Sequence, residues 1–282
     1  MKRIISIVSI CLFAIVKLYA QGEQLELVYK QVDTTRLKMK VYYPEDYKKG
    51  EQRPAIILFF GGGWNGGSMN QFRMHARHFA SKGMVAITAD YRVKKRQNTT
   101  PFECVKDARS AIRYLREHAK GLGIDTSRIA AGGGSAGGHI AAAADLTRID
   151  EVTDNLSVNP RPNALILFNP VFNNGPENYG YERLTERYLE ISPFHNIQQG
   201  AAPTIVFLGT NDKLIPVETA KAYQRKMQEV GSRCDLFLYE GQGHGFFNYS
   251  PKRDKKYYNE TVAEAVKFLV SLGFIEEEGA LM

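Results

Sequence analysis

Cysteine is scarce in this chain of 282 residues, which contains only Cys11, Cys104 and Cys234. So few cysteines exclude a disulfide scaffold, and no cysteine–histidine group has the spacing of metal ligands. Cys104 falls where a predicted helix leaves the top of a sheet and Cys234 where a strand enters at the bottom, a separation that no disulfide spans. We therefore expect two buried thiols, no metal and no organic cofactor.

The sequence also lacks internal repeats, low-complexity tracts and proline- or serine-rich linkers. Without a linker, the economical interpretation is a single domain over residues 21–282. A domain of roughly 260 residues is large enough to bury a substantial core.

The longest apolar stretch of the N-terminus is short, covering residues 4–16 after Lys2 and Arg3. It is too short for a membrane span, and it is followed at Ala20 by a small residue typical of a cleavage site. The pattern predicts a secretory signal peptide over residues 1–20, export to the periplasm or the medium, and no stable membrane insertion after cleavage. An uncleaved membrane anchor is the alternative.

The chain carries only a small excess of positive charge. Removing the signal peptide leaves 34 of the 37 basic residues against 30 acidic ones, a net charge of +4 in place of +7. This is far from the balance of a nucleic-acid-binding protein, so we expect no such partner. A basic cluster (Arg92, Lys94, Lys95 and Arg96) fits either a solvated loop or a docking surface for an acidic polymer. The sequence leaves the oligomeric state open.

What the sequence does contain is an alternation of strand and helix patterns. Residues 25–32 and 37–43 alternate apolar and polar side chains about a short turn, which predicts an antiparallel hairpin. Apolar runs typical of strands buried on both faces follow at residues 55–60, 84–89, 128–131, 164–168, 204–208 and 236–239. Helical spacing is found at residues 71–81, 101–119, 136–145, 217–230 and 257–272.

This alternation predicts an α/β fold with a mostly parallel, doubly wound sheet of about eight strands and an antiparallel N-terminal hairpin. In such sheets the ligand site lies beyond the carboxyl ends of the strands. Ser135 lies at such an end, within Gly133-x-Ser135-x-Gly137, between a predicted strand and an alanine-rich helix. The pattern is typical of a nucleophile held on a sharp strand–turn–helix connection.

A serine nucleophile needs a general base and a group that orients that base. His244, flanked by glycines, follows the last predicted strand, and Asp212 lies on the loop after the strand before it. The chain order Ser135, Asp212, His244 is the one that α/β-hydrolases use. Glu240 is the fallback acid. The other histidines of the mature chain are expected to pack or to satisfy local hydrogen bonds: His75, His78, His118, His139 and His195.

These motifs resemble those of an α/β-hydrolase carboxylesterase, and more narrowly of the bacterial feruloyl-esterase/acetylesterase group related to hormone-sensitive-lipase-like enzymes. The resemblance rests on residues 60–64, 90–92 and 133–139, the Asp212 loop and the His244 loop. It implies an oxyanion hole built from the backbone N–H groups of Gly62, Gly63 and Ala136. A flexible loop is the alternative interpretation of the three consecutive glycines.

Two residues depart from the pattern of the group. Phe60 stands where a histidine usually opens the oxyanion loop, and Gly134 stands where many relatives carry an acidic residue before the serine. Both departures remove polar groups that would brace the loop but leave the backbone donors in place.

The resemblance implies a serine ester hydrolase. Relatives in the hormone-sensitive-lipase-like group usually carry a helical cap ahead of the core, but here only about 30 mature residues precede the first buried strand, so we expect no large N-terminal cap. An insertion at residues 173–199 is expected to form a partial lid or one wall of the cleft, and Trp64 is expected either to stack on a substrate ring or to pack in the core. An open site favours short acyl groups, acetyl or feruloyl, on a polysaccharide or another bulky alcohol. A serine peptidase, a lipase and a non-catalytic binding protein are the rival interpretations.

Overall fold

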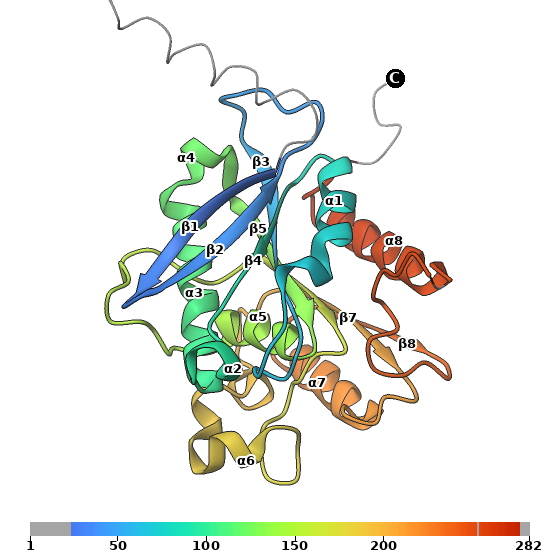
Figure 1. Cartoon of the computed structure of the whole chain (residues 1–282). Coiled ribbons are helices and arrows are strands. Elements are labelled where there is room, and N and C mark those ends of the chain that lie inside the picture. Colours follow the sequence, from blue (N-terminus) through green and yellow to red (C-terminus); the bar gives the residue numbers. More distant parts are fainter. Residues whose placement is uncertain (1–23, 253, 277–282) are drawn as a thin grey trace, which may run out of the picture.

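The computed structural model describes residues 24–252 and 254–276, which form one eight-stranded sheet with helices on both faces (Figure 1). The strand order is β1-β2-β4-β3-β5-β6-β7-β8. The strands are β1 (Gln24–Val32), β2 (Thr35–Tyr42), β3 (Arg53–Phe59), β4 (Val85–Ala89), β5 (Ile124–Gly134), β6 (Ala164–Phe168), β7 (Thr204–Gly209) and β8 (Cys234–Tyr239).

The sheet confirms the predicted α/β class and its antiparallel hairpin. β1 pairs antiparallel with β2, and β2 pairs antiparallel with β4, whereas every later pairing is parallel. In β2, Leu37, Met39 and Val41 are buried and alternate with more exposed residues, because only one face of this hairpin meets the core. β4 and β6 are buried at every residue, as expected of central strands covered on both faces.

Helices cover both faces of the sheet. The longer ones are α1 (Arg73–Ser81), α3 (Pro101–Glu117), α5 (Ala136–Leu146), α7 (Val217–Glu229) and α8 (Lys256–Ser271). Side chains of α3, α5 and α7 belong to one apolar core and those of α1 and α8 to the other, on the opposite face (Figure 1). The strand–helix alternation of the sequence thus becomes a three-layer structure.

Several short elements were not predicted. They are α2 (Lys94–Gln97), α4 (Ala119–Leu122), α6 (Tyr181–Leu184) and the 3₁₀ turns η1 (Met69–Phe72), η2 (Thr185–Glu190) and η3 (Pro193–Asn196). The predicted helix at 101–119 ends at Glu117, and α4 follows it until Gly123, whose φ of +67° stops it. Single turns of this kind are too short for a periodic sequence signal.

The basic cluster is neither a uniformly solvated loop nor one continuous docking surface. Arg92 is buried and binds Asp107, which is 0% exposed and also accepts a hydrogen bond from Lys30 at 2.7 Å. Glu151 accepts from both cations. Because four chain segments meet in this ion network, it joins the hairpin, the segment after β4, α3 and the loop after α5.

The two thiols in the described residues behave as predicted: Cys104 and Cys234 are free and buried. The signal peptide and Cys11 lie outside the described residues. In the part of the chain that the structure describes, none of the helices has the length and apolar character to cross a bilayer.

We predict that Asp107→Ala lowers the free energy of unfolding by about 3–5 kcal/mol, since it leaves two cations buried without their main partner. Chemical denaturation measures this loss. Asp46→Ala is the matched control: Asp46 pairs with Arg53 at 3.3 Å but its side chain is 73% exposed, so about 1 kcal/mol or less is expected. Equal effects of the two substitutions would contradict a stabilising role for the buried network.

Candidate active site

Ser135 lies at the turn between β5 and α5, as the sequence predicts. Its φ is +53° and its ψ −118°, a strained conformation for a residue with a Cβ atom. The turn is fixed by hydrogen bonds, since the Ser135 N–H donates to the Phe168 carbonyl at 2.9 Å and the Ser135 carbonyl accepts from the His139 N–H at 3.0 Å. The strain is therefore held by the ends of β6 and α5.

The glycines on either side of Ser135 are required by close backbone contacts. A Cβ on Gly133 would lie 2.4 Å from the Phe59 carbonyl oxygen, and a Cβ on Gly137 only 2.1 Å from the same atom. No side chain fits at either position without moving β3 or the turn. The motif thus reflects how tightly the serine turn packs against the end of β3.

Asp212 and His244 come together at the ends of β7 and β8. His244 Nδ1 donates to Asp212 Oδ2 at 2.7 Å, and the Asp212 side chain is 0% exposed. Burial alone would raise the pKa of Asp212, but hydrogen bonds from His244, Asn169 and the Leu214 N–H lower it below its usual value. Asp212 is therefore an ionised acceptor, which keeps the proton of His244 on Nδ1 and leaves Nε2 free to accept one.

Asn169 is a residue of this group that the sequence analysis missed. It is 0% exposed, has a φ of +42°, and its Nδ2 donates to the same Asp212 oxygen that His244 binds. Because Asn169 directly follows β6, a polar residue at a strand end was the available signal. Its amide thus helps to orient the Asp212 carboxylate that His244 binds.

Ser135 and His244 line a common cavity of about 310 Å³ at the carboxyl edge of the sheet. Its other walls come from the glycine loop after β3, from η1, from the insertion at 173–199 and from the segment after His244. The remaining lining residues are Gly61, Gly62, Gly63, Asn65, Gln71, Tyr179, Arg183, Leu214, Gly245, Phe247 and Asn248.

Two of the three predicted oxyanion donors border this cavity. Gly62 and Gly63 line it and adopt φ values of +129° and +59°. Ala136 is the first residue of α5, so its N–H has no partner within the helix and lies at the positive end of the helix dipole. The Gly61 N–H is already bound to Gln71 Oε1 at 2.6 Å.

The structure gives a physical account of both departures from the pattern of the group. Phe60 stacks on Tyr91 with ring centroids 4.2 Å apart, and the Tyr91 hydroxyl donates to the Phe60 carbonyl at 2.7 Å. A Cβ on Gly134 would lie 2.6 Å from the ring of Phe247, which occupies the space that a larger side chain would need. Aromatic packing by Phe60 and Phe247 thus takes the place of the histidine and the carboxylate that relatives carry at positions 60 and 134.

The structure corrects the expectation that Trp64 stacks on a substrate ring. Trp64 is only 1% exposed, and its ring packs against Tyr179 and His139 at centroid distances of 5.7 and 5.0 Å, with Arg183 over it. A ring covered in this way has no face for a substrate. Trp64 is a core residue beneath the insertion, the alternative that its sequence position left open.

Residues 173–199 form one wall of the cavity. Tyr179 and Arg183 both line it, and Arg183 donates a hydrogen bond to the Gly63 carbonyl. The insertion is therefore attached to the glycine loop.

The solved structures include a protein that this chain closely resembles over nearly its whole length. A propionate-bound structure of esterase 2 from Thermogutta terrifontis matches with a TM-score of 0.86 and 42% identity, covering 91% of this chain and 97% of that chain. A butyrate-bound structure of the same esterase gives a TM-score of 0.86. The BD-FAE family matches residues 39–166.

This chain belongs to the α/β-hydrolase carboxylesterases of the hormone-sensitive-lipase-like group.

Curated members of the family are more distant. Esterase LipC of Mycobacterium tuberculosis is 29% identical over 220 residues, covering 69% of this chain and 54% of that protein. Acetylxylan esterase of Xylanibacter ruminicola is 27% identical over 231 residues, covering 76% of this chain and 44% of that protein. The chain thus spans about half the length of the curated relatives it matches.

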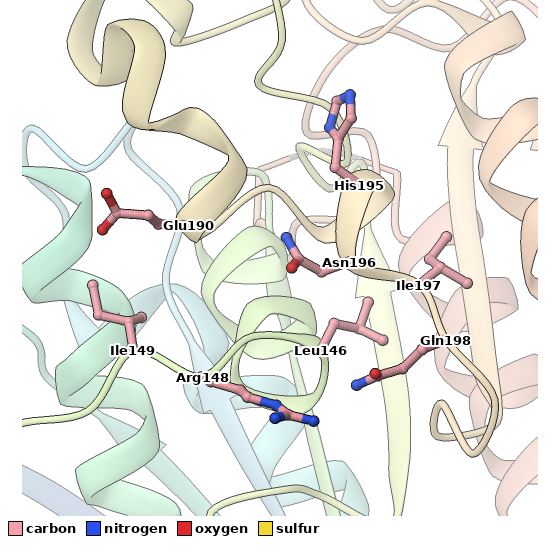
Figure 2. A pocket seen from close by; sticks show the side chains of 8 residues that line it. All are labelled: Leu146, Arg148, Ile149, Glu190, His195, Asn196, Ile197 and Gln198. Carbon is pink, nitrogen blue, oxygen red and sulfur yellow. The ribbon is translucent and has the colours of Figure 1, made fainter.

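A larger cavity of this carboxylesterase, about 530 Å³, lies away from the serine (Figure 2). It is formed where the C-terminal end of α5, at Leu146 and Arg148, faces the end of the insertion, at Asn196 and Gln198. Ser135, Asp212 and His244 are not among its lining residues, so its size does not make it the reaction site.

Four of the five other histidines have surroundings that suit packing or local hydrogen bonding. Burial lowers the pKa of His75 to about 3 and that of His139 to about 4, and both are 0% exposed. His118 stacks on Tyr114, and His195 Nδ1 bonds to the Ser192 hydroxyl. These contacts agree with the packing roles that the sequence analysis gave them.

We predict that the buried, neutral His75 makes the fold less stable in acid. At pH 5 the unfolded chain binds a proton at His75 that the folded chain excludes, so stability present above pH 6.5 is lost as the pH falls toward 3. The expected loss from this residue between pH 7.5 and pH 5 is about 2 kcal/mol. Denaturation at both pH values should show a smaller difference for His75→Phe than for the wild type. An unchanged difference would contradict the assignment.

Proposed function

We propose that this protein is a serine ester hydrolase that acts through a covalent acyl-enzyme, with Ser135, His244 and Asp212 as its catalytic residues. The observation that carries the proposal is the hydrogen bond from His244 to an ionised Asp212, together with the cavity that both His244 and the strained Ser135 line. Two relatives from Mycobacterium tuberculosis, esterase LipC and the probable carboxylic ester hydrolase LipM, support the same reaction class.

The proposed reaction has two stages, acylation of Ser135 and hydrolysis of the acyl-enzyme. Ser135 Oγ attacks the ester carbonyl while His244 Nε2 accepts its proton, and Asp212 stabilises the imidazolium that forms. The N–H groups of Gly62, Gly63 and Ala136 stabilise the negative charge on the carbonyl oxygen. His244 next protonates the departing alcohol and later activates a water molecule that releases the acid from Ser135.

The proposed substrate carries a short acyl group, acetyl or feruloyl, on a polysaccharide or another bulky alcohol. The cavity of about 310 Å³ is at the lower limit of small-molecule sites, and Asn65, Gln71 and Asn248 give it a polar lining. Propionate and butyrate are bound in the related Thermogutta structures, and one curated relative is an acetylxylan esterase. With the expected signal peptide, we propose action outside the cytoplasm.

Ser135→Ala should lower ester turnover by roughly 10⁴-fold or more, because the three residues act as a unit. Hydrolysis of 4-nitrophenyl acetate by the purified protein measures this. Paraoxon, which phosphorylates the related Thermogutta esterase, should add one phosphoryl adduct to the wild type and none to the variant, as read by mass spectrometry. Ser127→Ala, an exposed serine of the same strand, is the matched control. Retained activity or labelling in Ser135→Ala would overturn the site assignment.

The size of the cavity predicts a preference for short chains. We expect kcat/KM to fall at least tenfold between the 4-nitrophenyl esters of butyrate and decanoate, since a longer chain must leave the cavity. Acetate release from acetylated xylan, and ferulate release from a feruloylated arabinoxylan, distinguish the two acyl groups. A preference for decanoate over butyrate would indicate a lipase instead.

A further inference from the structure

Two amide side chains connect the glycine loop after β3 with the loop that carries His244. Gln71, on η1, accepts a hydrogen bond from the Gly61 N–H at 2.6 Å and donates through Nε2 to Asn248 Oδ1 at 2.9 Å. Asn248 in turn donates through Nδ2 to the Gly245 carbonyl at 2.9 Å. The two side chains, 177 positions apart in sequence, meet across the wall of the cavity that Ser135 and His244 line.

The direction of this chain of hydrogen bonds is fixed. Each amide uses its oxygen as acceptor at one end and its nitrogen as donor at the other, so flipping either amide would put like groups together at two contacts. Both side chains are half-buried. Because these hydrogen bonds are connected and each amide has one allowed orientation, a displacement of the glycine loop is transmitted to the His244 loop, and the reverse.

The series of hydrogen bonds acts on a single peptide group at the start of the oxyanion loop. The Phe60 carbonyl and the Gly61 N–H belong to the same planar peptide, and Tyr91 donates to the former while Gln71 accepts from the latter. This peptide is held at both ends. Its orientation determines where the following N–H groups of Gly62 and Gly63 point.

At its other end the series of hydrogen bonds acts on the backbone beside His244. Gly245 has a φ of +85°, and its carbonyl also accepts from the Asn248 N–H at 3.1 Å. Glycines on both sides give the His244 loop large conformational freedom in isolation, so side-chain contacts must fix it. Asp212 holds the ring, whereas Asn248 holds the backbone that carries it.

We propose that Gln71 and Asn248 are positioning residues that keep the oxyanion donors and the general base at a fixed separation. The expected effect on kcat rests on the proposed ester hydrolysis. The expected coupling between the two loops rests on the hydrogen bonds alone. Neither amide is a catalytic residue, because each acts through the backbone of another residue. Gln71 and Asn248 brace the oxyanion loop, where Phe60 has no polar side chain that could do so.

A double-mutant cycle tests the proposal. Gln71→Ala and Asn248→Ala should each lower kcat roughly 10- to 100-fold on 4-nitrophenyl acetate, with KM changed by about twofold or less. Because breaking either link opens the whole chain, the double variant should be no slower than about the worse single one. Asn70→Ala, an exposed amide on the same turn, is the matched control and should match the wild type.

Hydrogen exchange tests the structural part without reference to activity. Asn248→Ala should speed exchange of the Gly61 N–H, which it does not contact, as measured by NMR on the intact chain. Asn248→Asp keeps the acceptor for Gln71 but loses the donor to Gly245, so exchange at Gly61 should change less than in Asn248→Ala. This conservative variant also serves if Asn248→Ala unfolds.

The outcomes separate the two proposals. The coupling would be overturned if the effects of Gln71→Ala and Asn248→Ala on kcat multiplied in the double variant. It would also be overturned if only KM changed, or if Asn248→Ala left the exchange rate of the Gly61 N–H unchanged. A wild type that hydrolyses no ester would instead overturn the proposed function, and the exchange measurement would still decide whether the two loops are coupled.

Discussion

The close approach of the serine turn to the end of β3 is the constraint on which the rest of the site depends. Gly133 and Gly137 allow the Phe59 carbonyl to lie where a Cβ would otherwise be, and Gly61 likewise meets the Gly134 carbonyl, 2.8 Å from where its own Cβ would lie. The register of β3 against β5 pairs Phe59 with Gly133. The glycine loop after β3 therefore begins beside Ser135, so strand pairing alone brings the proposed nucleophile and the candidate oxyanion donors together.

The same parallel sheet delivers the remaining groups in order. β6, β7 and β8 lie successively beside β5, and their carboxyl ends lead to Asn169, Asp212 and His244. Each strand end contributes one polar side chain to a hydrogen-bonded series whose acceptor is the buried Asp212 carboxylate. The fixed handedness and spacing of parallel strands explain why residues that are far apart in sequence meet at one edge.

Local patterns were enough to predict the sheet, the long helices and the order Ser135, Asp212, His244, because each depends on a short window of sequence. Gln71 and Asn248 were not predictable, since their pairing depends on how η1 packs against a loop 177 positions away. The burial of Arg92 was not predictable for the same reason: its partner Asp107 becomes apparent only once α3 packs beside the segment after β4. Burial likewise decided the role of Trp64, which its position beside the glycine loop left ambiguous.

The bracing of this site differs in kind from one built on a histidine and a carboxylate. Phe60 and Gly134 remove those ionisable groups, and the ring of Phe247 occupies the space beside the serine turn. What braces the loops instead is aromatic stacking and a pair of neutral amides. A carboxylate gains a proton, and with it a hydrogen-bond donor, as the pH falls, whereas a neutral amide keeps the same donor and acceptor atoms. The hydrogen bonds that join the oxyanion loop to the His244 loop therefore run between groups that carry no charge.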